Sequence, residues 1–152
     1  MAKPVLVLNG PNLNMLGTRE PAVYGRDTLE DVRRLAEARA AALGLAIDFR
    51  QSNHEGELVG WIQEARTTAS GIILNAGALT HTSIGILDAL QAAAVPVIEV
   101  HLSNIFRREA FRQHSYVSLA AQGVICGLGA KGYELALEAM ADILSKTSAG
   151  SG

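Results

Sequence analysis

The chain has 152 residues, of which 49% are hydrophobic, enough for one domain whose core needs no disulfide or metal. Thirteen Lys and Arg stand against fifteen Asp and Glu, giving a formal net charge of −2, and no basic run is interleaved with aromatic residues. These features argue against a nucleic-acid partner. The single cysteine, Cys126, lies in an apolar run, so we interpret it as a small core residue.

No stretch of the sequence reaches the roughly 18 consecutive apolar residues of a membrane span. The apolar part of the N-terminal segment is too short for a signal peptide, which favours a cytoplasmic protein. We expect a single domain over residues 1–146 and a small, polar, disordered tail over residues 147–152.

The first predicted element is a buried strand that starts at Val5 and breaks at Asn9-Gly10-Pro11. A long connection follows, hinged by glycine and proline and carrying Arg19 and Tyr24. Long loops inside a compact domain usually bind or cover something. Arg19 and Tyr24 are therefore the first candidates for chemistry.

Strands and helices alternate along the rest of the chain. A helix over about 28–43 follows a capping-box pattern of Asp27 with Glu30, and Gly44 ends it. The later elements are predicted as a strand over 45–49, a turn over 52–56, a helix around 58–65, a strand over 71–75, a loop over 76–82, a helix over 83–94, a strand over 97–101, an irregular segment over 104–117, a strand over 124–128 and a helix around 135–143. This alternation predicts an α/β fold, a flavodoxin-like three-layer sandwich whose five-stranded parallel sheet has the order 2-1-3-4-5.

In open sheets of this kind, ligands bind beyond the carboxyl ends of the strands, where the strand order reverses. Here that point lies between the first and third strands. Polar residues follow three of the predicted strands, at 9–14, 75–81 and 101–103. The sequence therefore predicts that these residues converge on one edge of the sheet.

Tyr24 and Arg19 form one candidate pair. Lowering the pKa of a phenol from about 10 to 7 or 8 requires about 3 to 4 kcal/mol. One guanidinium at about 4 Å, with an effective dielectric constant near 20, supplies about 4 kcal/mol before desolvation. The charge of Arg19 is thus sufficient to lower the pKa of Tyr24 into the range of a base. The alternative is that Tyr24 packs as a loop anchor while Arg19 is solvated.

Glu99 and His101 form a second pair, because alternation places both side chains on the same side of a strand. A carboxylate there would fix the tautomer of the imidazole and raise its pKa, which suits a general acid. A buried ion pair with a purely structural role is the alternative. Ser103 could act as a nucleophile beside the histidine, but no G-x-S-x-G elbow surrounds it.

Several residues could position a ligand. Their side chains can donate or accept hydrogen bonds or bind an anion, and their backbone N–H groups can also hold an anion. They are Asn12, Asn75, His81, Leu102, Ser103 and Arg112. Each could equally form a turn or a helix cap. Asp88 shares a helical stripe with Ile84, Leu87 and Gln91, so it is either a boundary residue or part of a subunit interface.

The sequence from Gly127 to Gly132 matches G-x-G-x-x-G, but the chain ends before the further strand and acidic residue that a dinucleotide site needs. A tight turn into the last helix is the preferred interpretation. No phosphate-binding loop ends in Lys-Ser or Lys-Thr, and the histidines and the cysteine lack metal-ligand spacing. A non-catalytic, flavodoxin-type module that holds an anionic or flavin ligand is the competing class.

Long motifs spread over nearly the whole chain resemble, in order, the type II 3-dehydroquinate dehydratases (type II dehydroquinases). The motifs are NGPNLNMLGTREPAVYG, QSNHEGELV, LNAGALTHTS with DAL, EVHLSN with REAFR, and GLGAKGY. The resemblance implies a flavodoxin-like fold, a hydro-lyase of aromatic biosynthesis (the shikimate pathway) or quinate breakdown that acts on 3-dehydroquinate without a cofactor, and a homododecamer built from four trimers.

The resemblance also implies roles for individual residues. Tyr24 matches the base, Arg19 the arginine that activates it, and His101 the general acid partnered by Glu99. Asn12 matches the asparagine that steadies the enolate together with a water. The implied substrate-binding residues are Asn75, Leu102 and Ser103 for the carboxylate, His81 and Arg112 for ring hydroxyls, and Asp88, which reaches into a neighbouring subunit's site.

Overall fold

Five parallel strands form one sheet in the order β2-β1-β3-β4-β5, which confirms the predicted topology. The structure is a computed structural model that describes residues 2–18, 20, 22 and 26–150, with side chains as far as residue 147. The strands are β1 (Val5–Asn9), β2 (Ile47–Gln51), β3 (Gly71–Asn75), β4 (Val97–His101) and β5 (Gly123–Cys126).

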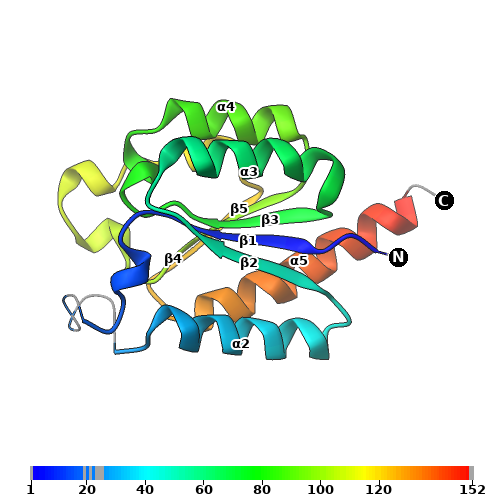
Figure 1. Ribbon diagram of the computed structural model, residues 1–152, viewed down its shortest axis with the longest axis horizontal. Coiled ribbons are helices and arrows are strands. Elements are labelled where there is room, and N and C mark those ends of the chain that lie inside the picture. Colours follow the sequence, from blue (N-terminus) through cyan, green and yellow to red (C-terminus); the bar gives the residue numbers. More distant parts are fainter. Residues whose placement is uncertain (1, 19, 21, 23–25, 151–152) are drawn as a thin grey trace.

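Helices cover both faces of the sheet, as right-handed crossovers between parallel strands require. The long helices are α2 (Leu29–Ala42), α3 (Glu55–Thr68), α4 (Ile84–Ala93) and α5 (Lys131–Gly150). In Figure 1, α3 and α4 lie above the sheet, whereas α2 and α5 lie below it. Short 3-10 helices complete the described chain: η1 (Leu13–Met15), η2 (Gly77–His81), η3 (Ile105–Arg107), η4 (Ala110–Arg112) and η5 (Val117–Leu119).

Strand alternation divides the core into two layers. Val5 and Val7 of β1 pack in the cluster with α2 and α5, whereas Leu6 and Leu8 pack in the cluster with α3 and α4. Every residue of β1, β3 and β4 is buried, because these strands have neighbours on both sides. The same alternation places the last residue of each central strand on a defined side at the carboxyl edge, on the left of Figure 1.

Some local predictions were wrong. The capping box at α2 is formed by Thr28 and Asp31, not by Asp27 and Glu30, because the Thr28 hydroxyl accepts from the Asp31 N–H at 3.1 Å and the Asp31 carboxylate accepts from the Thr28 N–H at 3.0 Å. The predicted turn over 52–56 is shorter, since α3 already begins at Glu55.

The last helix is longer than the predicted stripe around 135–143, since α5 runs from Lys131 to Gly150. The segment predicted as irregular, 104–117, carries two short 3-10 helices, η3 and η4, and η5 begins at its end.

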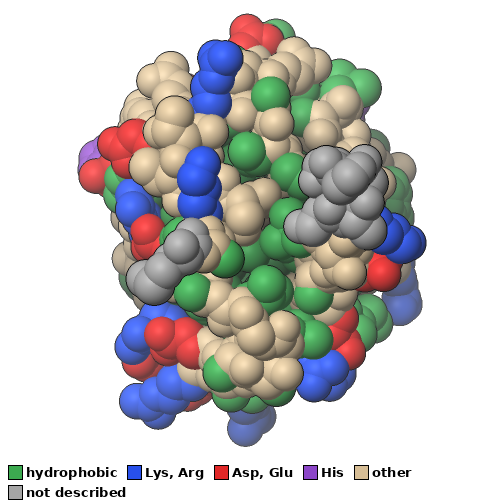
Figure 2. Space-filling view, turned by 90° about the vertical axis from the view of Figure 1, so that its right-hand side faces the viewer, with side chains coloured by type: hydrophobic (Ala, Val, Ile, Leu, Met, Phe, Trp, Pro, Cys, Tyr) green, Lys and Arg blue, Asp and Glu red, His purple; other side chains and the backbone are tan. Residues whose placement is uncertain are grey.

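The end of the molecule that holds the two chain termini faces the viewer in Figure 2. Positive and negative side chains are interspersed around a hydrophobic centre on this face, with no continuous basic surface. In the part of the chain that the structure describes, no helix combines the length and the apolar character needed to cross a membrane.

Candidate active site

A pocket lies at the edge of the sheet where β1, β3 and β4 end, next to the reversal of strand order between β1 and β3. Its lining residues come from the segments that follow these strands: Pro11, Asn12, Leu13, Leu16, Asn75, Gly77, Ala78, His81, Leu102, Ser103, Arg108 and Arg112. The structure thus brings together the predicted positioning residues that follow three different strands. All of them except Asp88 line this pocket.

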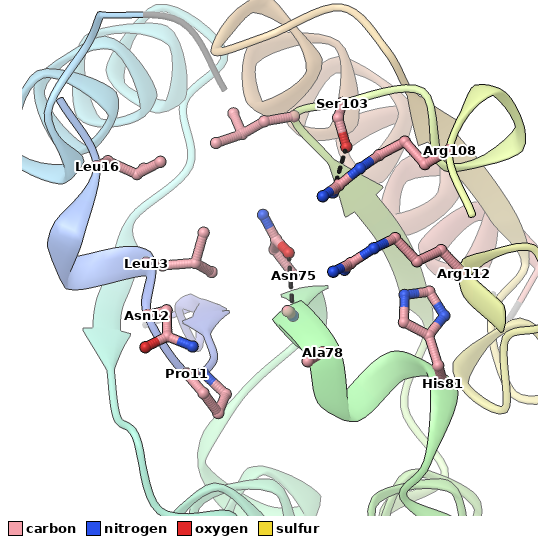
Figure 3. Close-up of a pocket in the computed structure, with 12 residues that line it drawn as sticks. Pro11, Asn12, Leu13, Leu16, Asn75, Ala78, His81, Ser103, Arg108 and Arg112 are labelled. Atoms are coloured by element: carbon pink, nitrogen blue, oxygen red, sulfur yellow. Dashed lines mark hydrogen bonds between the residues drawn. The ribbon is translucent and has the colours of Figure 1, made fainter. Parts of the chain in front are cut away.

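The pocket has two chemically different walls (Figure 3). Side chains of Leu13 in η1 and of Leu16 directly after it lie on one side, and Asn75 lies in the middle. Arg108, Arg112 and His81 lie on the other side. One wall therefore offers apolar contact and the other offers positive charge and hydrogen-bond donors. An anionic, hydroxylated ligand with one apolar face matches such a site.

Close backbone contact joins the segments that follow β1 and β3, next to the residues that line the pocket. A Cβ added to Gly10 would lie 2.4 Å from the carbonyl oxygen of Ala76, so only glycine fits there. The Gly10 N–H donates to the Asn75 carbonyl at 2.8 Å. Gly77, at φ +59°, would place a Cβ 2.9 Å from the carbonyl of Pro11. These contacts hold Asn75 and the η2 segment against the end of β1.

His81 is held by a single backbone contact. Its Nδ1 lies 2.8 Å from the carbonyl oxygen of His114, which makes Nδ1–H the donor and leaves Nε2 for a ligand. Burial lowers the pKa of His81, and the nearby His101 and Arg112 lower it further, against the opposing effect of the His114 carbonyl. The imidazole is therefore favoured in its neutral form at neutral pH, with an acceptor at Nε2.

Glu99 and His101 form a buried pair. Their exposed fractions are 1% and 5%, and the Nε2 of His101 lies 2.5 Å from a carboxylate oxygen of Glu99. Neither residue lines the pocket, although the next two residues, Leu102 and Ser103, do. Because Nε2 faces Glu99, Nδ1 is the ring nitrogen that remains for proton transfer.

Two serines complete the surroundings of Glu99. The hydroxyl of Ser115 donates to the carboxylate at 2.8 Å, and the hydroxyl of Ser118 donates to its other oxygen. Burial alone raises the pKa of Glu99, but the hydrogen bonds from His101, Ser118 and Ser115 and the charge of His101 outweigh it. The pKa of Glu99 therefore lies below its ordinary value, and the carboxylate stays ionised beside His101.

The arginines of the cationic wall are anchored near their own segment. The Nε of Arg112 donates to Glu109 at 2.7 Å, and its guanidinium lies 5.0 Å from the centre of the Phe111 ring. Arg108 donates to the hydroxyl of Ser103 at 3.4 Å. No histidine contacts that hydroxyl among the residues that the structure describes, so the geometry does not favour a Ser–His nucleophile.

The remaining sequence candidates are Arg19, Tyr24 and Asp88. Arg19 and Tyr24 lie outside the described residues. Asp88 is exposed on α4 and does not line the pocket. Its stripe is exposed at Ile84 and Gln91 as well, but Leu87, which the sequence placed on the same stripe, is buried in its own chain.

Four residues of this region were not assigned from the sequence. Arg108 lines the pocket, Ser115 and Ser118 contact Glu99, and the hydroxyl of Tyr133 contacts Asn75. Only Arg108 carried a usable signal, as a second arginine four residues before Arg112. The other three act across the fold, from segments that local patterns do not connect to the strand ends.

The glycine-rich segment before α5 is a structural turn. The segment from Gly127 to Gly132 forms a turn into α5, with Gly127 and Gly129 at positive φ, as predicted. Within the described ranges, no group of three or more His, Cys, Asp or Glu side chains has an arrangement that could hold a metal ion.

Comparison with known proteins identifies the family. The family model described as "Dehydroquinase class II" matches residues 3–141. The 3-dehydroquinate dehydratase of Phenylobacterium zucineum is 62% identical over 143 residues (94% of this chain and 99% of that protein), and that of a Caulobacter species is 59% identical over 144 residues (95% and 98%). The type II dehydroquinase structure from Propionibacterium acnes superposes with a TM-score of 0.89 at 46% identity, covering 93% of this chain and 98% of that one. The chain therefore belongs to the class II dehydroquinase family.

Proposed function

We propose that this protein dehydrates 3-dehydroquinate to 3-dehydroshikimate, as a cofactor-independent hydro-lyase of the shikimate pathway or of quinate breakdown. The pocket at the β1/β3 reversal supports this function most directly, because it combines an apolar wall with a wall of two arginines and a neutral histidine. The substrate is a small ring with a carboxylate, hydroxyls and a ketone, which needs both kinds of contact.

In this proposal, the substrate carboxylate is bound by the Asn75 amide and by the backbone N–H groups of Leu102 and Ser103. The ring hydroxyls contact His81 and Arg112. Nε2 of neutral His81 would accept a hydrogen bond from a ring hydroxyl, and the guanidinium of Arg112 would donate one to a hydroxyl oxygen. The apolar wall would cover one face of the ring and exclude water from it.

The proposed reaction is an anti elimination through an enolate. Tyr24, as a phenolate activated by Arg19, removes the proton next to the ketone, and Asn12 with a water steadies the enolate oxygen. His101 then protonates the departing hydroxyl. An acid and a base of this kind each contribute about 10²- to 10⁴-fold to the rate.

The buried Glu99–His101 pair supports the acid half of this mechanism. An ionised carboxylate lies 2.5 Å from Nε2, which leaves Nδ1 as the ring nitrogen that faces proton transfer. Proton transfer then requires the substrate hydroxyl to reach the strand end beside Leu102. An imine route would need a lysine instead, but Lys3, Lys131 and Lys146 are exposed and none lines the pocket.

We further propose that the active form is a homododecamer of four trimers, in which Asp88 reaches a neighbouring site. The exposed apolar Ile84, 55% exposed one turn before Asp88, supports a covered face at this position of α4. In this arrangement each pocket would be completed by a carboxylate from the next subunit.

An ultraviolet assay for the conjugated enone product tests the function. We expect turnover when 3-dehydroquinate is supplied to purified protein with no metal or cofactor, in the presence of a chelator. A colourless protein without activity would contradict the proposal, and a coloured or phosphorylated co-purified ligand without activity would favour the flavodoxin-type binding module. A seryl-directed covalent inhibitor should leave Ser103 unlabelled.

A further inference from the structure

A buried tyrosine from the C-terminal helix connects the ends of the two strands that flank the pocket. Asn9 and Asn75 are the last residues of β1 and β3 and are direct neighbours in the sheet register. Both face the α2 and α5 side of the sheet, and Tyr133 of α5 reaches them from below with an exposed fraction of only 1%. Its hydroxyl donates to the Asn9 Oδ1 at 2.6 Å and accepts from the Asn75 Nδ2 at 3.0 Å.

Asn75, Tyr133 and Asn9 form a hydrogen-bonded bridge. Its hydrogen bonds run in one direction only, because backbone groups fix the amides of Asn75 and Asn9 at its two ends. The Nδ2 of Asn9 donates to the carbonyl of Arg50 at 3.0 Å, so the Asn9 oxygen must face Tyr133. The N–H of Gly77 donates to the Asn75 Oδ1 at 3.2 Å, so the Asn75 nitrogen must face Tyr133. Flipping either amide would place like groups in contact.

We infer that Tyr133 is a positioning residue that, together with the Gly77 N–H, locks the Asn75 amide in the one orientation that presents an N–H donor to a ligand in the pocket. One N–H of the amide is used by Tyr133 and the oxygen is used by Gly77. The second N–H is left for an acceptor such as a carboxylate. The inference rests on the proposed function and adds to it the residue that selects an anionic group at Asn75.

Tyr133 itself takes no part in proton transfer. It does not line the pocket, and burial raises the pKa of its hydroxyl far above neutrality, so the hydroxyl stays protonated. Its ring packs in the core, 6.4 Å from the ring of Phe49. Removing the hydroxyl while keeping the ring is therefore the cleanest perturbation, because the packing volume hardly changes.

A double-mutant cycle on the purified enzyme tests this role. We expect Tyr133→Phe to raise the KM for 3-dehydroquinate about tenfold, the size of one directed hydrogen bond, with a smaller effect on kcat. In an Asn75→Ala background the same substitution should change KM less than about twofold. An equal effect in both backgrounds, or no effect in either, would overturn the inference.

Three further measurements separate positioning from general loss of stability and from failure of the proposed function. Met140→Ala removes a buried side chain of the same helix that packs against Gly71, at the opposite end of β3, and should lower the Tm without changing KM. Asn9→Ala, which removes the acceptor of Tyr133, should reproduce the KM effect if the Tyr133 variant is poorly folded. A crystal structure of Tyr133→Phe should show a rotated Asn75 amide whether or not the wild-type protein turns over 3-dehydroquinate, and an unmoved amide would refute the bridge itself.

Discussion

Replacing Ser118 with alanine removes one of the hydroxyl groups that keep Glu99 ionised. The carboxylate is 1% exposed, so no solvent replaces the lost donor, and only Ser115 and His101 continue to donate to it. A hydrogen bond to a charged group contributes about 1.5 to 3 kcal/mol, and one pKa unit corresponds to about 1.4 kcal/mol. The pKa of Glu99, followed by NMR of its labelled side-chain carboxyl carbon, should therefore rise by about one pH unit or more.

The direction of this shift follows from the charge of Glu99. Losing a donor destabilises the carboxylate relative to the carboxylic acid, so Glu99 takes up a proton at a higher pH than in the wild type. The variant therefore loses, at a higher pH than the wild type, the carboxylate that contacts the Nε2 of His101. His81 and Arg112, the other groups electrostatically coupled to this site, are unchanged by the substitution.

The assay is an NMR titration of the labelled Glu99 carboxyl carbon from acid to neutral pH. Ser118→Thr keeps the hydroxyl and should restore the wild-type titration. Ser83→Ala is the matched control, because Ser83 is also buried but caps α4 by accepting from the Ile86 N–H at 2.9 Å. That variant should cost about 1 kcal/mol of stability and leave the Glu99 titration in place. An unchanged Glu99 titration in Ser118→Ala, or an equal shift in Ser83→Ala, would refute the reasoning.

Four other predictions concern the proposed reaction, the fold and the assembly. Tyr24→Phe should fold normally, by circular dichroism and Tm, and lose at least about 10²-fold in kcat, whereas an active variant would remove Tyr24 from the role of base. Gly10→Ala should destabilise the protein by about 1 to 3 kcal/mol in urea titrations, because its Cβ would lie 2.4 Å from the carbonyl of Ala76; an unchanged midpoint would contradict the close contact. The pKa of Glu99 is lower in the folded protein than its ordinary value of 4.5, so this residue adds stability above that pH that is lost as the pH falls through the folded pKa, and Glu99→Gln should show a flatter acid dependence of the unfolding free energy. Sedimentation should find the 16.0 kDa chain in a dodecamer, and Asp88→Ala should lower kcat/KM, while a fully active monomer would exclude a shared site.

The central strands were predictable from the sequence because their signals are local. The bounds of β3 and β4 agree with the prediction at both ends, since each is an apolar run that stops at a polar residue, Asn75 and His101. The edge strands were predicted less accurately. Strand β2 begins at Ile47 instead of Leu45, and β5 covers Gly123–Cys126 instead of 124–128, because half-exposed strands lack a continuous apolar run.

The pocket was predictable for a topological reason. Once the order 2-1-3-4-5 is assigned, the polar residues after β1, β3 and β4 must meet at one edge, and the residues from Asn12 to Arg112 that line the pocket do so. The alternation of side chains along a strand could not predict how deeply each side chain is buried. Glu99 and His101 share a side of β4 as expected, but both are buried and only the following residues reach the pocket wall.

The groups that tune the site could not be predicted, because each depends on contacts between distant segments. The hydroxyl of Tyr133 meets an asparagine 124 positions earlier, and Ser118 donates to a carboxylate 19 positions earlier across an irregular segment. Nothing in the local pattern around either residue separates it from an ordinary core tyrosine or a turn serine. Yet these contacts decide whether Glu99 is ionised and which way Asn75 faces. The double-mutant cycle on Tyr133 and the pH titration of Glu99 test this division of roles. In it, the strand ends carry Asn75, Glu99 and His101, and the segments packed behind them set the charge and orientation of these side chains.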